Sequence, residues 1–323
     1  MIVENTLFIL GAGSSKPYGF LTGNELRNYI CGEFPIEFKE LMKEANLDKS
    51  DYAFWSQQAD KLAKVFYASS APSIDQFLSF NPSLSHIGKL AITYKIRKCE
   101  IGSSFRQHSK EKSSDWYSKL FGSLIAGFTE NKDLEDIKNN KISFITFNYD
   151  RSLESFLLES FRNLFYDRLQ KIVVTDEQDE IFRAIMPFKI FHVYGSVDKN
   201  EWEQGTPYRE EVAFDQIQKL SSNIKTIGEI NEADNKEINS LFKNAKRIYL
   251  LGFGYLIENM RILGFPKRIN VDQKVYGTAL NYSKKNISDL KIVIERGSQN
   301  KSMPKPFPII EDMNCLELLN EYL

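Results

Sequence analysis

Four short apolar runs constrain the fold of this 323-residue chain more than any other feature. They cover residues 7–10, 142–147, 188–194 and 247–251. Their apolar residues are nearly continuous rather than alternating, as expected of strands buried on both faces of a parallel sheet. Residues 271–280 and 290–294 are weaker strand candidates. The runs predict an α/β fold with a Rossmann-like, mostly parallel sheet and helices on both faces.

Small or polar residues follow each of the four strong runs. These are Gly11-Ala12-Gly13, Asn148-Tyr149-Asp150, Gly195-Ser196 and Gly252-Phe253-Gly254. Ligands of open α/β sheets bind beyond the carboxyl ends of the strands. We therefore expect these four chain segments to converge on one crevice.

Helical patterns fill the intervals between the predicted strands. Thr22 and Glu25 fit a capping box that starts a helix. Residues 152–169 form an amphipathic pattern, and residues 314–323 form a closing helix. Residues 34–140 contain no clear strand, and their aromatics recur at helical spacing, as in the packing of a core. The chain is thus predicted to be one domain, 1–323, with a mainly helical insertion at about 34–140 that covers the sheet. A smaller excursion follows at about 197–246.

Composition narrows the classes of protein that fit this chain. Lys plus Arg number 42 and Asp plus Glu number 43, so overall charge provides no case for direct nucleic-acid binding. The three cysteines are far apart, which argues against a disulfide framework and a thiolate zinc site. The apolar run at residues 6–10 is too short for a signal peptide or a membrane span. We expect a cytoplasmic protein without a metal or a membrane association.

The first loop, from Gly11 to Ser15, has the character of a phosphate-binding turn. Glycines allow close backbone approach, and exposed N–H groups bind the charge of a pyrophosphate. Lys16 stands where a G-x-G-x-x-G motif needs its third glycine, and no acidic residue ends a clear second strand about 20 residues later. These departures argue against an ordinary dehydrogenase. A plain strand-to-helix turn is the alternative, with a long loop at residues 14–21 before the first helix.

The next two motifs carry side chains suited to chemistry. In Thr146-Phe147-Asn148-Tyr149-Asp150, Asn148 can hold a hydroxyl or a water, because an amide both donates and accepts. Asp150 can accept from an amide or hydroxyl, and it is equally suited to cap the following helix. His192 ends a buried strand, where a histidine is either a general base or a core residue. The turn at Gly252 fits a ribose contact or a structural turn.

Taken in order, these motifs resemble the SIR2-like family, in the divergent branch found in bacterial defence NADases. The resemblance implies that the residues of the first loop, with Thr146, Gly195 and Ser196, bind NAD+. The first-loop residues are Gly11, Ala12, Gly13, Ser14 and Ser15. The resemblance also places Asn148 by the nicotinamide ribose and Asp150 near the carboxamide, and it makes His192 the general base. Gly252, Phe253, Gly254 and Asn281 would lie at the adenosine half. Residues 197–246 contain no cysteine, so the zinc module of sirtuin deacetylases is missing.

The resemblance implies an NAD+ hydrolase that cleaves the nicotinamide–ribose bond to give nicotinamide and ADP-ribose. NAD+ is then the substrate, and anti-phage defence is the expected role. Activation would come from assembly into a homo-oligomer, from the helical insertion or from a separate sensor, which in that family is an ATPase or an Argonaute-like protein. Two alternatives use the same pocket, a non-catalytic NAD or ADP-ribose sensor and an ADP-ribosyltransferase. A His192 that faces away from the crevice would favour the sensor.

Overall fold

The computed structural model describes residues 1–103, 113–128, 134–169, 187–200, 203–270, 272–298 and 307–323. Six parallel strands form one sheet in the order β3-β2-β1-β4-β5-β6. The strands are β1 Thr6–Leu10, β2 Ile142–Thr146, β3 Lys189–His192, β4 Arg247–Leu251, β5 Lys274–Thr278 and β6 Ile309–Glu311. The predicted α/β class with a Rossmann-like parallel sheet is confirmed.

A row of aromatic rings crosses one face of the sheet. Phe8 of β1 is in register with Phe144 of β2 and Tyr249 of β4, and its ring stacks on both at 5.3 Å between centroids. Tyr249 stacks in turn on Tyr276 of β5 at 4.9 Å. Residues paired at the same register point to the same face of a sheet. Tyr322, from the closing helix, extends this row at 5.2 Å from Tyr276.

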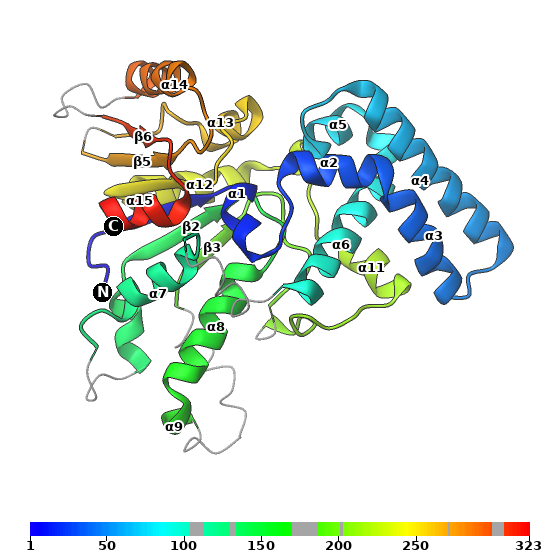
Figure 1. Ribbon diagram of the computed structural model, residues 1–323, viewed down its shortest axis with the longest axis horizontal. Coiled ribbons are helices and arrows are strands. Elements are labelled where there is room, and N and C mark those ends of the chain that lie inside the picture. Colours follow the sequence, from blue (N-terminus) through cyan, green and yellow to red (C-terminus); the bar gives the residue numbers. More distant parts are fainter. Residues whose placement is uncertain (104–112, 129–133, 170–186, 201–202, 271, 299–306) are drawn as a thin grey trace.

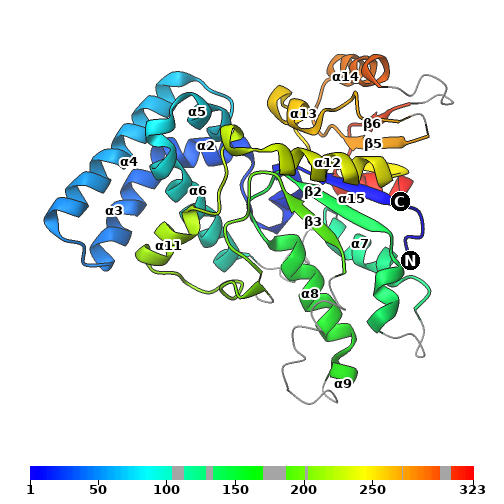
Figure 2. The ribbon, with the colours of Figure 1, turned by 180° about the vertical axis from the view of Figure 1, so that it is seen from behind.

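Helices lie on both faces of the sheet. In Figures 1 and 2, α7 and α15 lie on one face and α12 on the other. The helices of this part of the molecule are α7 Trp116–Ile125, α8 Ser152–Leu164, α9 Tyr166–Leu169, α12 Glu232–Asn244, α13 Ile257–Leu263, α14 Lys284–Gly297 and α15 Cys315–Tyr322. The predicted closing helix 314–323 is α15, and Asn314 caps it through a capping box with Glu317.

Six further helices pack on one another beside the sheet and form what we call the helical lobe (Figure 1). They are α2 Gly23–Gly32, α3 Phe34–Glu44, α4 Lys49–Ser69, α5 Ile74–Phe80, α6 Ser85–Gly102 and α11 Phe214–Ser221. Short 3-10 turns lie at Lys16–Tyr18, Pro82–Leu84, Leu134–Asn139 and Ile227–Glu229. The predicted capping box of Thr22 and Glu25 starts α2.

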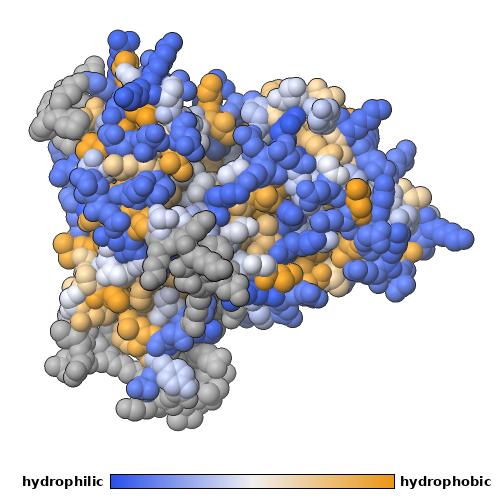
Figure 3. All heavy atoms as spheres, in the orientation of Figure 1, coloured by the Kyte–Doolittle hydropathy of each residue, from blue (hydrophilic) through white to orange (hydrophobic). Residues whose placement is uncertain are grey.

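The predicted helical insertion departs from expectation in its position. Its helices α3–α6 build the lobe rather than cover the sheet, and α7 is the insertion helix that packs with α8 and α15. Phe66, Phe77 and Trp116 are buried, as core packing predicts. Phe54 and Tyr67, however, are 52% and 70% exposed. In Figure 3 hydrophilic side chains cover much of the lobe, with single apolar residues between them.

Three local predictions are wrong. The apolar run 290–294 lies within α14, where Ser283 caps the helix, because a short apolar run does not distinguish strand from helix. Strand β6 was missed, because the sequence predicts no strand after residue 294. Residues 14–21 do not form a long loop, since α1 Ala12–Ser15 begins at once and a 3-10 turn follows it.

None of the helices in the described ranges is both long and apolar enough to cross a membrane.

Candidate dinucleotide-binding site

The candidate site begins where β1 and β4 lie side by side at the centre of the sheet. Successive strands are added outward from β1 on one side of the sheet and from β4 on the other, so the order of addition changes direction between these two strands. Dinucleotides bind at this point in sheets of that order. The loops that follow the two strands meet at this point. The Gly11 N–H donates to the Leu251 carbonyl at 3.0 Å, and the Gly13 N–H donates to the Gly252 carbonyl at 3.1 Å. The two strand ends are thereby joined by backbone hydrogen bonds.

Close contact between these loops accounts for their glycines. A Cβ on Gly11 would lie 2.5 Å from the Gly252 oxygen, and one on Gly13 would lie 3.0 Å from it. A Cβ on Gly252 would lie 2.1 Å from the Ser14 nitrogen, and Gly252 has a φ of +57°. Only glycine adopts such a conformation routinely and leaves such a space. The packing of the loops therefore requires these glycines with or without a ligand.

The same geometry changes which N–H groups are available to a phosphate. The N–H groups of Gly11, Gly13 and Ser14 all donate within the protein, the last to the Gly11 carbonyl at 2.9 Å. The expectation that these groups hold a pyrophosphate is therefore not met. Ala12 begins α1, and the first N–H of a helix has no intrahelical acceptor. The start of α2, at Thr22, Gly23 and Asn24, lines the same space.

A cavity of about 590 Å³ lies at this junction. Its walls come from the first loop, the end of β2, the start of α2 and α5, and the loops that follow β4 and β5. A second cavity of about 510 Å³ is largely apolar and shares Gly13, Gly252, Phe253 and Gly254 with the first. We call the two together the crevice. Sheet and lobe thus enclose it from opposite sides.

Asn148 is the residue whose surroundings most clearly point to a ligand. Its backbone N–H donates to Thr146 Oγ1 at 3.0 Å, and its Nδ2 donates to Ser14 Oγ at 3.2 Å and to Ser15 Oγ at 2.9 Å. The side chain is therefore fixed. Its Oδ1 is buried and finds no hydrogen-bond partner in the described part of the chain. Asn148 lines the 590 Å³ cavity, so this oxygen is an acceptor left for a hydroxyl or a water.

Asp150 is held by hydrogen bonds at the start of α8. Its Oδ1 accepts from the Ser152 N–H at 3.1 Å, from the Ser152 hydroxyl, and from Ser15 Oγ at 3.3 Å. The N-cap residue of α8 is Arg151 rather than Asp150, and Asp150 binds the N–H of the first helical residue. Asp150 also lines the crevice. Burial raises the pKa of its carboxyl to about 6, although the hydrogen bonds of Ser152 oppose that rise.

His192 does not line the crevice in this structure. Its Nδ1 lies 3.0 Å from the Asn148 carbonyl, and its Nε2 lies 2.6 Å from Glu154 Oε1. It lines instead a separate polar cavity of about 360 Å³ with Glu154 and Asp198. Burial opposes the charged imidazole, but the Glu154 carboxylate offsets it and raises the pKa above 6.5. Both ring nitrogens thus face acceptors of the protein and His192 does not line the crevice, so this arrangement does not support a general base.

The remaining predicted residues fall into two groups. Gly195 is structural, since its φ is +72° and a Cβ would lie 1.9 Å from the Asn223 oxygen. Ser196 lines the polar cavity beside His192 rather than the crevice. Phe253, Gly254 and Asn281 all line the crevice. Phe253 is buried against the ring of Phe147, with 5.4 Å between centroids. The structure thus brings the first, second and fourth motifs together in the crevice, while the side chains of His192 and Ser196 line the neighbouring polar cavity.

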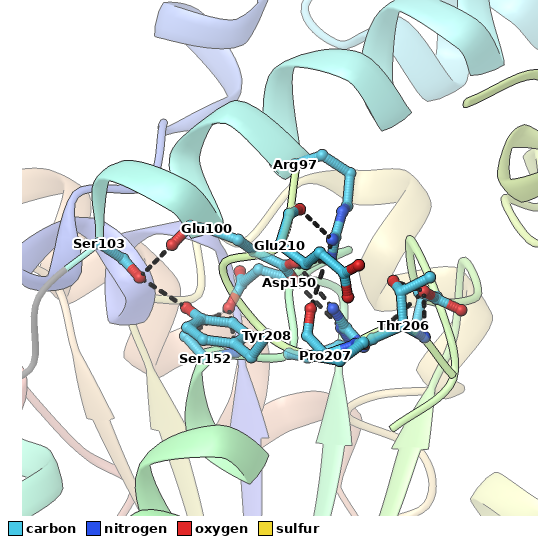
Figure 4. A network of polar contacts seen from close by, with 12 residues as sticks. Arg97, Glu100, Ser103, Asp150, Ser152, Thr206, Pro207, Tyr208 and Glu210 are labelled. Atoms are coloured by element: carbon cyan, nitrogen blue, oxygen red, sulfur yellow. Dashed lines mark hydrogen bonds and ion pairs between the residues drawn. The ribbon is translucent and has the colours of Figure 1, made fainter. Parts of the chain in front are cut away.

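A buried ionic network connects the lobe to the residue after Asp150 (Figure 4). Glu100 of α6 accepts from Arg97 and, at 3.1 and 2.9 Å, from Nε and Nη2 of Arg151. All three side chains are at most 2% exposed. Arg151 also donates to the carbonyls of Lys199 and, at 2.9 Å, of Thr206. The network fixes α6 and the start of α8 against residues 198–199 and 206–210 in one arrangement.

Two polar residues in these cavities were not predicted. Asp75 lies in the helical insertion, where the sequence shows no catalytic motif, and it reaches the crevice through the packing of the lobe. Glu154 lies on α8 with His192 as its partner, and its exposure is only 2%. Glu154 lies in the first turn of α8, where an acidic residue is common, so its position gave no signal of a partner. Nothing in the local sequence distinguishes Asp75.

No known protein-family model matches this sequence, and no curated protein matches it either. Within the described ranges, no three His, Cys, Asp or Glu residues are grouped to hold a metal ion.

Proposed function

We propose that this protein binds NAD+ in the crevice and hydrolyses the nicotinamide–ribose bond, giving nicotinamide and ADP-ribose. The observation that carries the proposal is the buried, unpartnered Oδ1 of Asn148 in a cavity at the reversal of the strand order. Strand order supports a dinucleotide, because the crevice extends over both halves of the sheet. Asn148 supports chemistry on a ribose, since a fixed amide oxygen accepts from a ribose hydroxyl or a water.

The reaction requires few functional groups, which fits this crevice. Nicotinamide leaves the pyridinium of NAD+ as a neutral molecule, so no general acid is needed to protonate it. Ordinary glycosides need such an acid and commonly a pair of carboxylates. Asn148 orients the attacking water or the ribose, and Asp150 accepts a hydrogen bond from the carboxamide. His192 acts indirectly, because its Nδ1 lies 3.0 Å from the backbone carbonyl oxygen of Asn148 and so helps to hold that residue.

The test measures nicotinamide release from NAD+ by the full chain, alongside NAD+ affinity by calorimetry. Loss of one hydrogen bond to a buried group costs about 1–3 kcal/mol, so Asn148→Ala should lower kcat/KM about 10- to 100-fold. Asn286→Ala changes an exposed asparagine on α14 and should leave both quantities unchanged. Wild-type protein that binds NAD+ but never releases nicotinamide, alone or with candidate activators, would contradict the hydrolase.

The position of His192 favours a second candidate, a sensor that binds NAD or ADP-ribose without cleaving it. Neither ring nitrogen of His192 is available as a base in this structure. Binding of ADP-ribose as tight as that of NAD+, without turnover, would identify this function. ADP-ribosyl transfer from the same pocket would instead increase the mass of an acceptor protein. Control by homo-oligomerisation or by a separate ATPase or Argonaute-like sensor, and a role in anti-phage defence, complete the proposal.

A further inference from the structure

We propose that Asp75 of the helical lobe is the general base of this reaction, an inference that rests on the proposed NAD+ hydrolysis. Asp75 lies in the first turn of α5, which Ser73 caps by accepting from the Gln76 N–H at 3.2 Å. Ser73, Ile74 and Asp75 line the same 590 Å³ cavity as Asn148 and Asp150. The lobe therefore contributes a carboxylate to a cavity whose opposite wall is the end of β2.

Asp75 is anchored to the motif that carries Asn148. The hydroxyl of Tyr149, the residue between Asn148 and Asp150, donates to Asp75 Oδ1. Tyr149 is 6% exposed, so this hydrogen bond lies in the interior. A single residue thus connects the carboxylate of the lobe to the chain segment that holds the ligand-facing amide. This bond fixes the direction of the Asp75 carboxylate.

A second set of contacts holds α5 over the crevice. Gln76 Nε2, next to Asp75, donates to Glu258 Oε1 of α13 at 2.8 Å. The following residue of α13, Asn259, accepts at 2.8 Å from the hydroxyl of Tyr194, and Tyr194 lies 6.2 Å from the Tyr149 ring. Tyr149 and Glu258 therefore both hold α5, and Tyr194 connects the chain segments that carry them. A general base needs such a fixed position relative to its substrate.

Asp75 suits the role of general base better than Asp150 and His192, the two titratable residues predicted from the sequence. The Oδ1 of Asp150 already accepts three hydrogen bonds from the protein, so this oxygen is engaged at the start of α8. Both ring nitrogens of His192 are bonded, and His192 lies outside the crevice. The described residues give Asp75 one side-chain donor, Tyr149. Burial raises the pKa of Asp75 to about 6, so it is ionised near pH 7 and still basic enough to accept a proton.

The proposed step balances without a further reactant. The oxygen of a water attacks C1′ of the nicotinamide ribose, and the bond from C1′ to the nicotinamide nitrogen breaks. Its electron pair remains on that nitrogen, which becomes neutral. The proton of the water passes to the Asp75 carboxylate and then to solvent. The products are nicotinamide, ADP-ribose and one proton.

The decisive variant is Asp75→Asn, which keeps the size of the side chain and its acceptor for Tyr149. We expect kcat to fall about 10²- to 10⁴-fold, the usual contribution of a general base, while NAD+ affinity stays close to that of wild type. Asp51→Asn, the same change at an exposed position of α4, should match wild type in both. Asp75→Asn that turns over NAD+ like wild type, or that loses NAD+ binding, would overturn the proposed role.

Tyr149→Phe adds a readout that a structural role would not affect. It removes the donor that stabilises the charged carboxylate and so raises the pKa of Asp75. The acid limb of the kcat profile should move to higher pH, whereas a variant that only loosens the fold would lose activity without moving the limb. An unmoved limb would overturn the proposal even if Asp75→Asn does not fold. Failure of wild type to release nicotinamide would instead contradict the hydrolase itself.

Discussion

Replacing Gly252 with alanine tests whether the meeting of the two loops is as close as the structure shows. The new Cβ would lie 2.1 Å from the Ser14 nitrogen and 2.4 Å from the Gly13 carbonyl carbon, both of them backbone atoms. Backbone cannot move aside as the tip of a side chain can, so overpacking of about 1–3 kcal/mol is expected. A φ of +57° adds about 1–2 kcal/mol for a residue with a Cβ. The sum predicts a loss of about 2–5 kcal/mol in the free energy of unfolding.

Chemical denaturation of Gly252→Ala beside Gly254→Ala makes the test specific. Gly254 lies in the same loop and lines both cavities, but a Cβ there would meet nothing within 4 Å. Gly254→Ala should therefore keep its stability to within about 1 kcal/mol and lower NAD+ affinity if the dinucleotide lies there. Gly252→Ala with wild-type stability would refute the close backbone contact and restore the view that these glycines exist for a phosphate.

Two further predictions concern buried charges. Glu154→Gln should lower the pKa of His192 in an NMR titration, because the Glu154 carboxylate is what raises it. A histidine whose pKa is raised by folding adds stability that is fully present below about pH 6.5 and is lost as pH rises through the pKa of the folded state. Glu154→Gln should therefore lower the free energy of unfolding mainly at acid pH. An unchanged His192 titration would contradict the ion pair. Glu100→Gln should lower the free energy of unfolding in urea by about 3–5 kcal/mol, since it removes the carboxylate that pairs with the buried guanidinium groups of Arg97 and Arg151. The exposed i,i+3 pair of Glu40 and Lys43 is the control, and Glu40→Gln should cost at most about 1 kcal/mol; equal losses would argue against a buried network.

The sheet could be predicted because each central strand carries its own signal. Leu7, Phe8 and Ile9 of β1 are fully buried, and burial on both faces is what makes such runs continuous. The edge was less predictable, since β6 has only three residues and two of them are partly exposed. The run at 290–294 shows the opposite error. Its apolar residues lie on a helix with Ile292 and Val293 exposed, where periodicity over five residues says little.

The candidate site was predictable only where residues close in sequence act together. Asn148 and Asp150 follow a strand end, and the sheet itself brings them to Ser15. His192 follows a strand end too, but the sequence does not say to which side of the sheet its ring turns. Glu154, on a helix 38 residues earlier, decides that orientation by binding its Nε2. Such a pairing between distant elements leaves no mark in a local motif.

The positions of Asp75 and His192 together suggest how binding and turnover are divided between the two parts of this molecule. The end of β2 provides the acceptor on Asn148 for the proposed NAD+ site. The lobe provides Asp75, whose place over the crevice depends on Tyr149 and on the contact of Gln76 with α13. Loss of these two contacts would therefore remove the proposed base while leaving the Asn148 acceptor in place. A partner that displaces α5 would control hydrolysis without altering NAD+ affinity. The proposed sensor and the proposed hydrolase would on this view be two positions of one helix rather than two different proteins.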